Sequence, residues 1–297
     1  MKATGYVLLD DRGVLALGGA DARDFLQGLV SNDLRLLSPE RAVYAALLTP
    51  QGKYLFDFIA FEQGDAILLD VEAARCQELL RRLVMYRLRA KVTIEDRSAD
   101  LRVLVVVGMQ EEAERGRASS WEGGVVAVDP RVAELGGRAI VPLSRLAGLP
   151  LEPMPRRVYD ELRLSLGVPE SSTDLVVQKS LLLESNFVEL AGVSFDKGCY
   201  VGQELTARTK YRALVRKRLL PVVVEGPLPE PGTPLMLAGR EAGEMRSGLG
   251  QRGMALVRLE ALAGGMPVLQ AGDSRLRPAW PEWLGPPPGT EASSEGA

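Results

Sequence analysis

The sequence predicts an α+β fold, and three observations lead to that prediction. Runs with strand-like alternation and runs with helical spacing follow each other irregularly along the chain. Apolar residues make up 46% of the 297 residues and charged residues 25%, a balance that allows a sizeable core. From Leu219 onward, short apolar runs separated by glycine and proline favour a small β-barrel or sandwich.

The N-terminal third of the chain predicts strands, helices and one hairpin. After an alternating first segment, Asp21 is placed as the N-cap of a helix that ends near residues 31–32. Strand-like runs over 42–48 and 54–61 flank Thr49-Pro50-Gln51-Gly52, which predicts a hairpin with Gly52 at positive φ. Further strands are expected over 66–71, 91–94 and 101–107, and a helix over 73–88.

The later part of the chain predicts a boundary, a barrel and a tail. A polar stretch over 111–120 indicates a short surface helix and loop, and prolines at 142, 150, 153 and 155 precede a helix over 157–166. The barrel is expected over 219–280. Residues 281–297 carry proline, glycine, serine and glutamate with little to bury, so they are predicted to form a disordered tail.

Composition excludes several classes of function. The chain has no histidine, which rules out Ser-His-Asp catalysis, histidine zinc sites and histidine-ligated haem. Its two cysteines, Cys76 and Cys199, are too few for a four-cysteine metal site or a disulfide framework. Because Cys76 lies inside a predicted helix, we expect it to be a packing residue. The net charge of −3 argues against a nucleic-acid partner.

The start of the chain lacks the layout of a secretory signal, since Asp10 and Asp11 interrupt its apolar stretch. No run of 18 apolar residues is present, so no membrane partner is expected. With free thiols and no export signal, the sequence predicts a cytoplasmic location.

Residues 193–209, VSFDKGCYVGQELTART, carry the most information about function. Gly198 and Gly202 flank Cys199 closely and allow a tight backbone path. A helix starting near Gly202 would place Cys199 just before its N-terminus, where the helix dipole and Lys197 favour a thiolate. Such a thiol is a good nucleophile or soft-metal ligand, and the alternative is a buried packing cysteine at a glycine turn.

The string DKGCYVGQELTAR resembles the K-G-C-[FY]-x-G-Q-E-x-x-x-[KR] signature of the YgfZ-type folate-binding proteins. These are relatives of the glycine-cleavage T-protein (aminomethyltransferase) that act in iron–sulfur protein maturation. Further segments of that family resemble, in chain order, DFLQGLVSNDL, LLTPQGKYLFDFIA and LVMYRLRAKVTIED of this chain. The family's mitochondrial-type iron–sulfur assembly branch is resembled by the segments GVPE and LESN. The resemblance covers most of residues 1–220.

This resemblance implies a fold of three subdomains around a central cavity, completed by the C-terminal β-barrel. Residues 1–218 would form a discontinuous α+β folate-binding portion of two interleaved subdomains, with the inserted part at about 45–145. Tetrahydrofolate or a derivative would bind in the central cavity. Candidate contacts to it are Asp57, Glu184, Asn186 and Arg208, with strand-edge capping as the alternative for Asp57 and turn hydrogen bonding for Glu184 and Asn186.

The resemblance also assigns the signature residues. The signature positions are occupied by Lys197, Gly198, Cys199, Gly202, Gln203, Glu204 and Arg208. Cys199 would be the functional thiol. In one hypothesis it is a ligand to an iron–sulfur cluster that is shared transiently, and in the other the folate is the reactive species and supplies or accepts a one-carbon unit at the cavity; the sequence does not choose between these. Because one cysteine cannot hold a cluster alone, a scaffold or carrier protein is a required partner in the first hypothesis.

Two departures from the aminomethyltransferase pattern bear on activity. The family has adjacent aspartates where this chain has Phe56-Asp57, and Ser165 stands where the motif R-x-E-x-G supplies a pterin-binding glutamate. A serine does not replace a carboxylate that accepts charge-assisted hydrogen bonds from two donors on the pterin edge. Aminomethyl transfer is therefore disfavoured, and the sequence leaves open whether the chain is an enzyme.

The favoured hypothesis is a folate-binding accessory factor in the assembly or repair of [4Fe–4S] proteins, with reduced folate and an iron–sulfur scaffold or carrier protein as partners. The alternative is a folate-dependent aminomethyl- or methyltransferase with an altered substrate, in which Asp57 orients the reacting group. A third reading is an interaction scaffold without a ligand. The basic residues over 208–218 would meet a folate tail, an acidic partner surface or only solvent, and a nucleic acid fits the mildly acidic chain less well.

Overall fold

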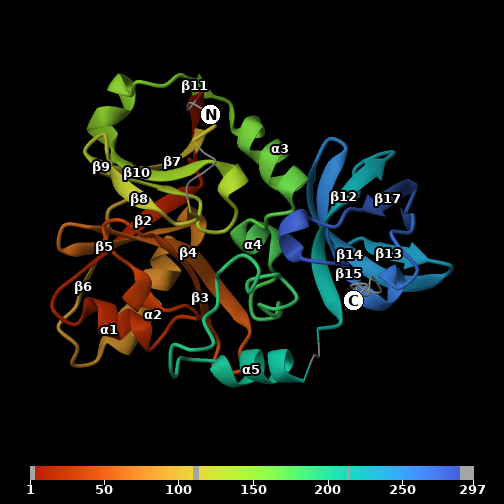
Figure 1. The fold of residues 1–297 in the computed structure, drawn as a ribbon, viewed down its shortest axis with the longest axis horizontal. Helices are drawn as coiled ribbons and strands as arrows, with labels where there is room; N and C mark the ends of the chain where they lie inside the picture. The colour runs from red at the N-terminus through yellow and green to blue at the C-terminus, as the bar shows by residue number, and fades with distance from the viewer. Residues whose placement is uncertain (1–3, 110–113, 213–214, 288–297) are drawn as a thin grey trace, which may run out of the picture.

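The chain forms three units, each built around its own β-sheet (Figure 1). The computed structural model describes residues 4–109, 114–212 and 215–287. A six-stranded sheet and a five-stranded sheet lie one above the other on one side of the molecule, and a closed six-stranded barrel lies on the other side. Two helices and a long irregular segment lie between the sheets and the barrel. The predicted α+β class and the C-terminal β-barrel are therefore confirmed.

The six-stranded sheet is assembled from distant parts of the N-terminal portion. Its order is β11-β1-β7-β10-β9-β8, and its strands are antiparallel neighbours except for the parallel pair β1 and β11. The strands are β1 (Gly5–Leu8), β7 (Leu101–Val107), β8 (Ala118–Trp121), β9 (Gly124–Val128), β10 (Gly137–Pro142) and β11 (Pro153–Met154). Both faces of β9 and β10 are buried, which explains their unbroken apolar sequences.

The five-stranded sheet is inserted between β1 and β7. Its order is β3-β4-β5-β2-β6, with α1 (Ala22–Gln27) and α2 (Cys76–Arg87) packed on it. Its strands are β2 (Arg12–Gly18), β3 (Val43–Leu48), β4 (Tyr54–Gln63), β5 (Ala66–Glu72) and β6 (Thr93–Asp96). The structure thus places the insertion at residues 12–96, not at about 45–145, because β7 pairs with β1, and β8, β9 and β10 continue the outer sheet from β7.

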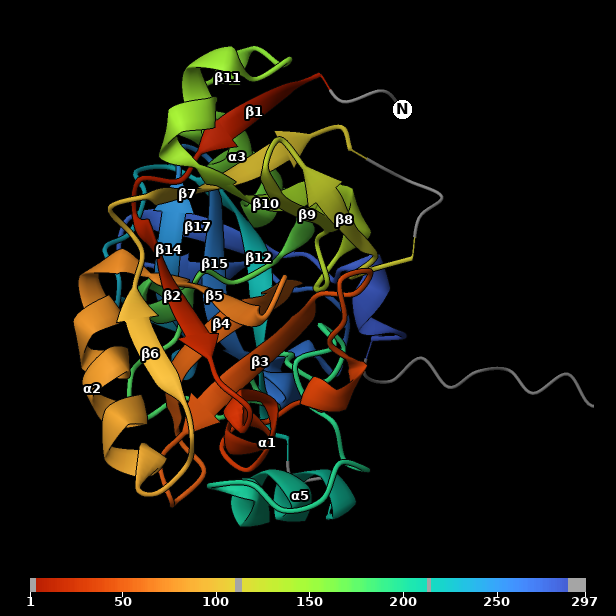
Figure 2. The ribbon, with the colours of Figure 1, turned by 90° about the vertical axis from the view of Figure 1, so that its left-hand side faces the viewer.

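Two helices and an irregular segment lead from the sheets to the signature residues. Helix α3 (Arg156–Leu166) ends at Gly167, and the short α4 (Ser171–Asp174) follows at once. Residues 175–202 then run without a long helix or strand until α5 (Gln203–Tyr211) begins. Figures 1 and 2 show α5 at the lower edge of the molecule, away from both the outer sheet and the barrel core.

The barrel closes in the order β12-β15-β14-β13-β16-β17. Its strands are β12 (Lys217–Glu225), β13 (Pro234–Leu237), β14 (Arg240–Leu249), β15 (Arg252–Arg258), β16 (Leu269–Ala271) and β17 (Ser274–Pro278). The expected disordered tail does not begin at 281. Trp283 donates from its ring nitrogen to the Leu166 carbonyl at 2.7 Å and Leu284 is buried, so this stretch packs on α3 and the barrel. The rest of the predicted tail, 288–297, lies outside the described residues.

Several local predictions can be compared with the structure. Gly52 has a φ of +75° in the β3–β4 hairpin, as expected. The Asp21 side chain precedes α1 but accepts a hydrogen bond from the Lys91 amide at 2.7 Å rather than from the helix. In the polar stretch over 111–120, residues 111–113 lie outside the described part, and its end belongs to the strand Ala118–Trp121 where a short helix and loop were expected. Short 3₁₀ turns complete the fold at Leu34–Leu36, Ala73–Arg75, Ala133–Leu135, Leu143–Gly148, Leu259–Leu262 and Glu282–Leu284.

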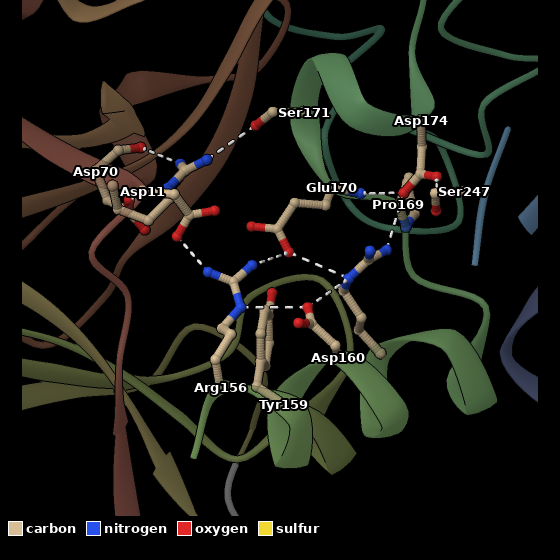
Figure 3. Close-up of polar contacts among 12 residues, drawn as sticks. Asp11, Asp70, Arg156, Tyr159, Asp160, Pro169, Glu170, Ser171, Asp174 and Ser247 are labelled. Atoms are coloured by element: carbon tan, nitrogen blue, oxygen red, sulfur yellow. Dashed lines mark hydrogen bonds and ion pairs between the residues drawn. The ribbon is translucent and has the colours of Figure 1, made fainter. Parts of the chain in front are cut away.

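Buried ion pairs join the three units near the middle of the molecule (Figure 3). Asp70 on β5 accepts from Arg12 at 2.6 Å and lies 3.0 Å from Arg138 of the outer sheet. Asp174 of α4 accepts from Arg163 of α3 at 2.9 Å and from Ser247 of the barrel at 2.5 Å. The side chains in these contacts are buried, including that of Arg12 at 4% exposure, so the ion pairs connect the units inside the protein. None of the described helices is long and apolar enough to span a bilayer.

Candidate functional site

Cys199 lies at the exposed tip of a segment that is buried on both sides. The thiol is solvent-exposed, whereas Lys197 and Tyr200 have exposed fractions of 5% and 7%. Helix α5 begins four residues later, with Gly202 as its N-cap in the left-handed conformation. The predicted helix start near Gly202 and the position of the thiol just before it agree with the structure. The alternative of a buried packing cysteine does not, because the side chain is in contact with solvent.

The Lys197 ammonium group is bound by backbone carbonyls and does not face the thiol as a free cation. Its Nζ donates to the carbonyl oxygens of Gln27 at 2.7 Å, Val30 at 2.6 Å and Asn32 at 2.8 Å. These carbonyls belong to the end of α1 and the turn after it, where backbone acceptors lack helical partners. Burial lowers the pKa of Lys197 to about 8. The residue therefore fastens the Cys199 segment to the five-stranded unit.

Two glycines bring α5 against the β3–β4 hairpin. A Cβ atom at Gly202 would lie 2.4 Å from the Thr49 carbonyl oxygen, and one at Gly52 would lie 2.7 Å from Leu205 Cβ. Both glycines have left-handed φ values, 81° and 75°. Gly198 also has a left-handed φ of 84°, but a Cβ there would meet open space. Gly202 is thus needed for close approach as well as for conformation, and Gly198 for conformation alone.

The residues after Cys199 either pack inside the protein or lie on the exposed side of α5. Tyr200 is buried next to Thr206 of α5, and burial raises the pKa of Tyr200 to about 12. Gln203 accepts a hydrogen bond from the Tyr200 amide at 3.4 Å. Glu204 and Arg208 form an i, i+4 ion pair of 2.8 Å on the exposed side of α5. Of the seven signature residues, only Cys199, Glu204 and Arg208 present polar side-chain groups mainly to solvent.

A groove with a volume of about 620 Å³ runs from Cys199 along α5, and we call it the thiol groove. It is lined by Pro50, Cys199, Tyr200, Gly202, Gln203, Glu204, Ala207, Arg208, Tyr211 and Arg212. Pro50 comes from the β3–β4 hairpin, so the hairpin and the signature segment share the wall of this groove. No group of three or more cysteine, histidine or acidic side chains within metal-binding reach occurs in the described residues.

Asp57 lies inside the protein and both of its oxygens are engaged. Oδ2 accepts from the Tyr44 hydroxyl at 3.0 Å and Oδ1 from the Tyr54 hydroxyl at 2.7 Å, and the residue is 5% exposed. Burial and the adjacent carboxylate raise the pKa values of both tyrosines well above their usual range. Asp57 is thus neither a strand-edge cap nor a carboxylate open to a ligand, so this structure does not support its predicted cavity role.

Glu184 and Asn186 connect to the barrel. The Asn186 side chain donates to the Leu219 carbonyl at 2.6 Å and accepts from Arg218 at 3.0 Å. The Glu184 carbonyl accepts from the Leu219 amide at 2.9 Å, and burial raises the pKa of the Glu184 carboxyl. Neither residue lines the thiol groove. The four predicted folate contacts are therefore not brought together, since Arg208 alone lies beside the thiol.

A second cavity of about 520 Å³ opens on the other side of Tyr211, and we call it the aromatic cavity. Its walls include Tyr44 and Phe195 together with the cationic side chains of Arg115 and Lys210. The Lys210 ammonium lies 3.6 Å from the centre of the Phe195 ring, and Arg115 donates to the carbonyls of Arg131 and Glu189. Sequence reasoning missed this cavity, because its walls come from segments about 150 residues apart.

Cys76 is separate from this site. It is buried in the core of the five-stranded unit, where burial raises its pKa to about 11. A thiol with that pKa stays protonated at neutral pH, which fits the expected packing role.

Comparisons with known proteins place the fold and then the family. The chain superposes on the crystal structure of glycine cleavage system aminomethyltransferase T from Bartonella henselae with a TM-score of 0.76, at 14% identity, covering 95% of this chain and 86% of the other. It therefore has an aminomethyltransferase-like fold, as predicted. Residues 216–286 match the family model described as the CAF17 C-terminal β-barrel domain.

Sequence relatives identify the family within this fold class. The mitochondrial iron–sulfur cluster assembly factors IBA57 of Mus musculus and Homo sapiens are 37% and 36% identical, over 86% and 93% of this chain and 78% and 84% of their own. A mitochondrial homologue from Pyricularia oryzae is 31% identical over 87% of this chain and 72% of its own. The chain belongs to the IBA57 family.

The same relatives correct one prediction and confirm another. The predicted cytoplasmic location is contradicted, because the matched relatives are mitochondrial proteins. The absence of a secretory signal could not distinguish the cytoplasm from an organelle. The resemblance to the mitochondrial-type assembly branch is confirmed, whereas the broader YgfZ-type label stays a prediction.

Proposed function

We propose that the chain is an accessory factor in the assembly or repair of iron–sulfur proteins, and that Cys199 is its contact to the cluster. One observation carries the proposal: an exposed thiol is held at the tip of a segment whose neighbours on both sides are buried. The family supports the role, since its curated members are named iron–sulfur cluster assembly factors.

The geometry favours a shared cluster over a resident one. A [4Fe–4S] or [2Fe–2S] cluster needs several thiolate ligands, and the chain offers one exposed cysteine. The remaining ligands must come from a scaffold or carrier protein, which makes the cluster a cargo held between two proteins. A single, pre-positioned ligand suits this task, because it binds with little ordering cost and releases the cluster when the partner leaves.

Lys197 and Gly202 do the positioning in this proposal. Three hydrogen bonds to carbonyls fix the segment before the thiol, and the contact with the hairpin fixes the helix after it. The thiol therefore keeps its place without the partner. This rigidity matters because ligands must meet a cluster within a fraction of an ångström to bind it.

Reduced folate is proposed as a ligand of the aromatic cavity. The flat rings of a folate can stack on Phe195, and its glutamate carboxylates can pair with Arg115 and Lys210. The four residues that the sequence singled out for folate do not support this binding. Tetrahydrofolate would here occupy a site that adjoins the thiol groove through Tyr211.

The transferase alternative is not favoured by any feature of the site. It required Asp57 to face the reacting amine or folate nitrogen, but both oxygens of Asp57 accept hydrogen bonds from buried tyrosines. Ser165, at the position of the family glutamate, is exposed on α3 and its hydroxyl donates to the Leu162 carbonyl at 2.7 Å. Neither Asp57 nor Ser165 is therefore placed to bind a folate for group transfer.

The functional test compares the two thiols. In cells lacking the endogenous protein, wild type and Cys76→Ala should restore the activity of [4Fe–4S] enzymes, and Cys199→Ala should not. Both substitutions remove one thiol, but only Cys199 is exposed. Full rescue by Cys199→Ala would refute the cluster contact. Protein levels in the three strains must be equal for the comparison to hold.

The folate proposal has its own measurement. Anaerobic calorimetry with tetrahydrofolate should show binding to wild type and to Cys199→Ala, and weaker binding to Phe195→Ala. Cys76→Ala serves as the control, since Cys76 lies in the core of the five-stranded unit and does not line the aromatic cavity. Absence of binding to wild type would remove folate and leave a partner-binding assembly factor.

A further inference from the structure

The outward side of α5 carries two parallel rows of side chains. In an α-helix, residues four positions apart lie above one another. One row consists of Glu204, Arg208 and Arg212, and the other of Gln203, Ala207 and Tyr211. All six line the thiol groove. The opposite side of the helix, with Leu205, Thr206 and Thr209, packs on the hairpin and on residues 181–183. The two rows are thus the free face of a helix that starts next to the thiol.

Positive charge is concentrated on this face. Glu204 is matched by Arg208, and Arg212 forms no ion pair with any described residue. Lys210 lies at the edge of this face, outside the thiol groove, where its ammonium contacts the Phe195 ring and forms no ion pair with a described residue. The side chains of Lys210 and Arg212 are both exposed. The chain as a whole carries a net charge of −3, so the positive charge of this helix is opposite in sign to that of the whole chain. Tyr211, 75% exposed, adds a large aromatic surface beside them.

We propose that this face of α5 docks an acidic, cysteine-bearing segment of a partner protein and brings the partner's thiol to Cys199. The inference rests on the proposed function for the role of the thiol and names the chemistry of its partner. Arginines bind carboxylates with paired hydrogen bonds, and unmatched cations steer an acidic surface from a distance. The row of Ala207 and Tyr211 supplies apolar contact at the centre.

A protein segment fits this face better than a nucleic acid does. A polyanion would meet the net negative charge of the rest of the chain, and a backbone of phosphates has no use for a thiol at the helix start. An acidic peptide chain can satisfy the arginines, cover Tyr211 and carry a second cysteine to the same point. The arrangement therefore selects for acidic residues next to the partner's own ligand cysteine.

Disulfide exchange with charged peptides tests this docking directly. Two peptides of equal length carry one cysteine flanked by glutamates or by lysines, each activated as a 2-thiopyridyl disulfide. The Cys199 thiolate attacks the peptide sulfur, a protein–peptide disulfide forms, and the bond to thiopyridine breaks. The released pyridine-2-thione is measured by its absorbance. Cys199→Ala gives the background rate of Cys76, which is small because that thiol is buried.

At low salt, wild type should react with the acidic peptide about tenfold faster than with the basic one, and added salt should reduce the ratio. The double variant Arg208→Gln/Arg212→Gln should lose most of this preference. The matched control Arg240→Gln/Arg275→Gln removes two exposed arginines from the barrel and should keep it. Equal rates for both peptides in wild type, or equal loss in both double variants, would overturn the proposal.

This experiment is independent of iron–sulfur chemistry, because no cluster is present. A charge preference in wild type together with full cellular rescue by Cys199→Ala would keep the docking face and refute the proposed cluster contact. No charge preference, with failed rescue by Cys199→Ala, would keep the cluster contact and refute the acidic partner.

Discussion

At the scale of single residues, the signature divides into side chains that position and side chains that face solvent. The sequence correctly indicated a solvent-accessible thiol just before a helix. It assigned Lys197 to the electrostatics of that thiol, whereas the ammonium group is bound to three carbonyls after α1. Those carbonyls lie about 170 residues earlier in the chain, so no local pattern could reveal them. The same holds for Asp57, whose partners are hydroxyl groups inside the core.

Replacing Lys197 with methionine should destabilise the protein by about 2–4 kcal/mol, because it removes charge-assisted hydrogen bonds and leaves buried carbonyls unpaired. Urea unfolding measures this free energy. The alkylation rate of Cys199, measured under native conditions, should change in the same variant because its segment is released. Lys179→Met, at an exposed site, is the control and should leave the unfolding free energy nearly unchanged. A stable Lys197→Met protein would show that the carbonyl contacts are dispensable.

At the scale of elements, the hairpin, most strands and the barrel follow from local pattern, and the contact between α5 and the hairpin does not. Turn residues and alternation predicted the β3–β4 hairpin and the positive φ of Gly52. The close approach of Gly52 and Gly202 depends on the path of residues 175–202. This segment shows neither helical nor strand periodicity, so its path could not be predicted from the sequence. The bounds of the insertion were missed for a similar reason, since β1 pairs with strands far along the chain.

Gly202→Ala should destabilise the protein more than Gly198→Ala does. Both substitutions put a side chain at a left-handed φ, which costs about 1 kcal/mol. Only Gly202 adds a clash with the Thr49 carbonyl, so its total should reach about 3 kcal/mol or more. Thermal unfolding of the pair isolates the contribution of close packing. Equal losses would mean that α5 and the hairpin can separate without cost.

At the scale of the whole molecule, buried charges set how the three units meet. Glu170 lies between Arg156 and Arg163, at 3.5 and 3.3 Å, and Asp174 connects α3 to the barrel (Figure 3). The sequence identified GVPE as part of a resemblance but gave no sign of a charged junction, because Arg12 and Arg138, whose charges also act on Glu170, come from strands far from it in the chain. The final packed turn at Glu282–Leu284 was missed likewise, since its contact is with α3.

This junction predicts acid sensitivity. The surrounding arginines lower the pKa of Glu170 from its usual 4.5 to about 2, against the opposing effect of burial. Its ionised form is therefore favoured by folding, so its contribution is present above about pH 4.5 and is lost as the pH falls towards about 2. Chemical unfolding of wild type and Glu170→Gln across this range should show a loss of stability that is smaller in the variant. Parallel curves would contradict the assignment.

The most direct test of the central claim is the fate of a cluster between two proteins. A purified iron–sulfur carrier loaded with its cluster is mixed anaerobically with wild type or with Cys199→Ala, and native mass spectrometry and visible circular dichroism follow the products. Wild type should form a complex of the two proteins that retains the cluster, and should hold none without the carrier. Cys199→Ala should form no cluster-bridged complex. An equal yield of that complex from both proteins would contradict the account.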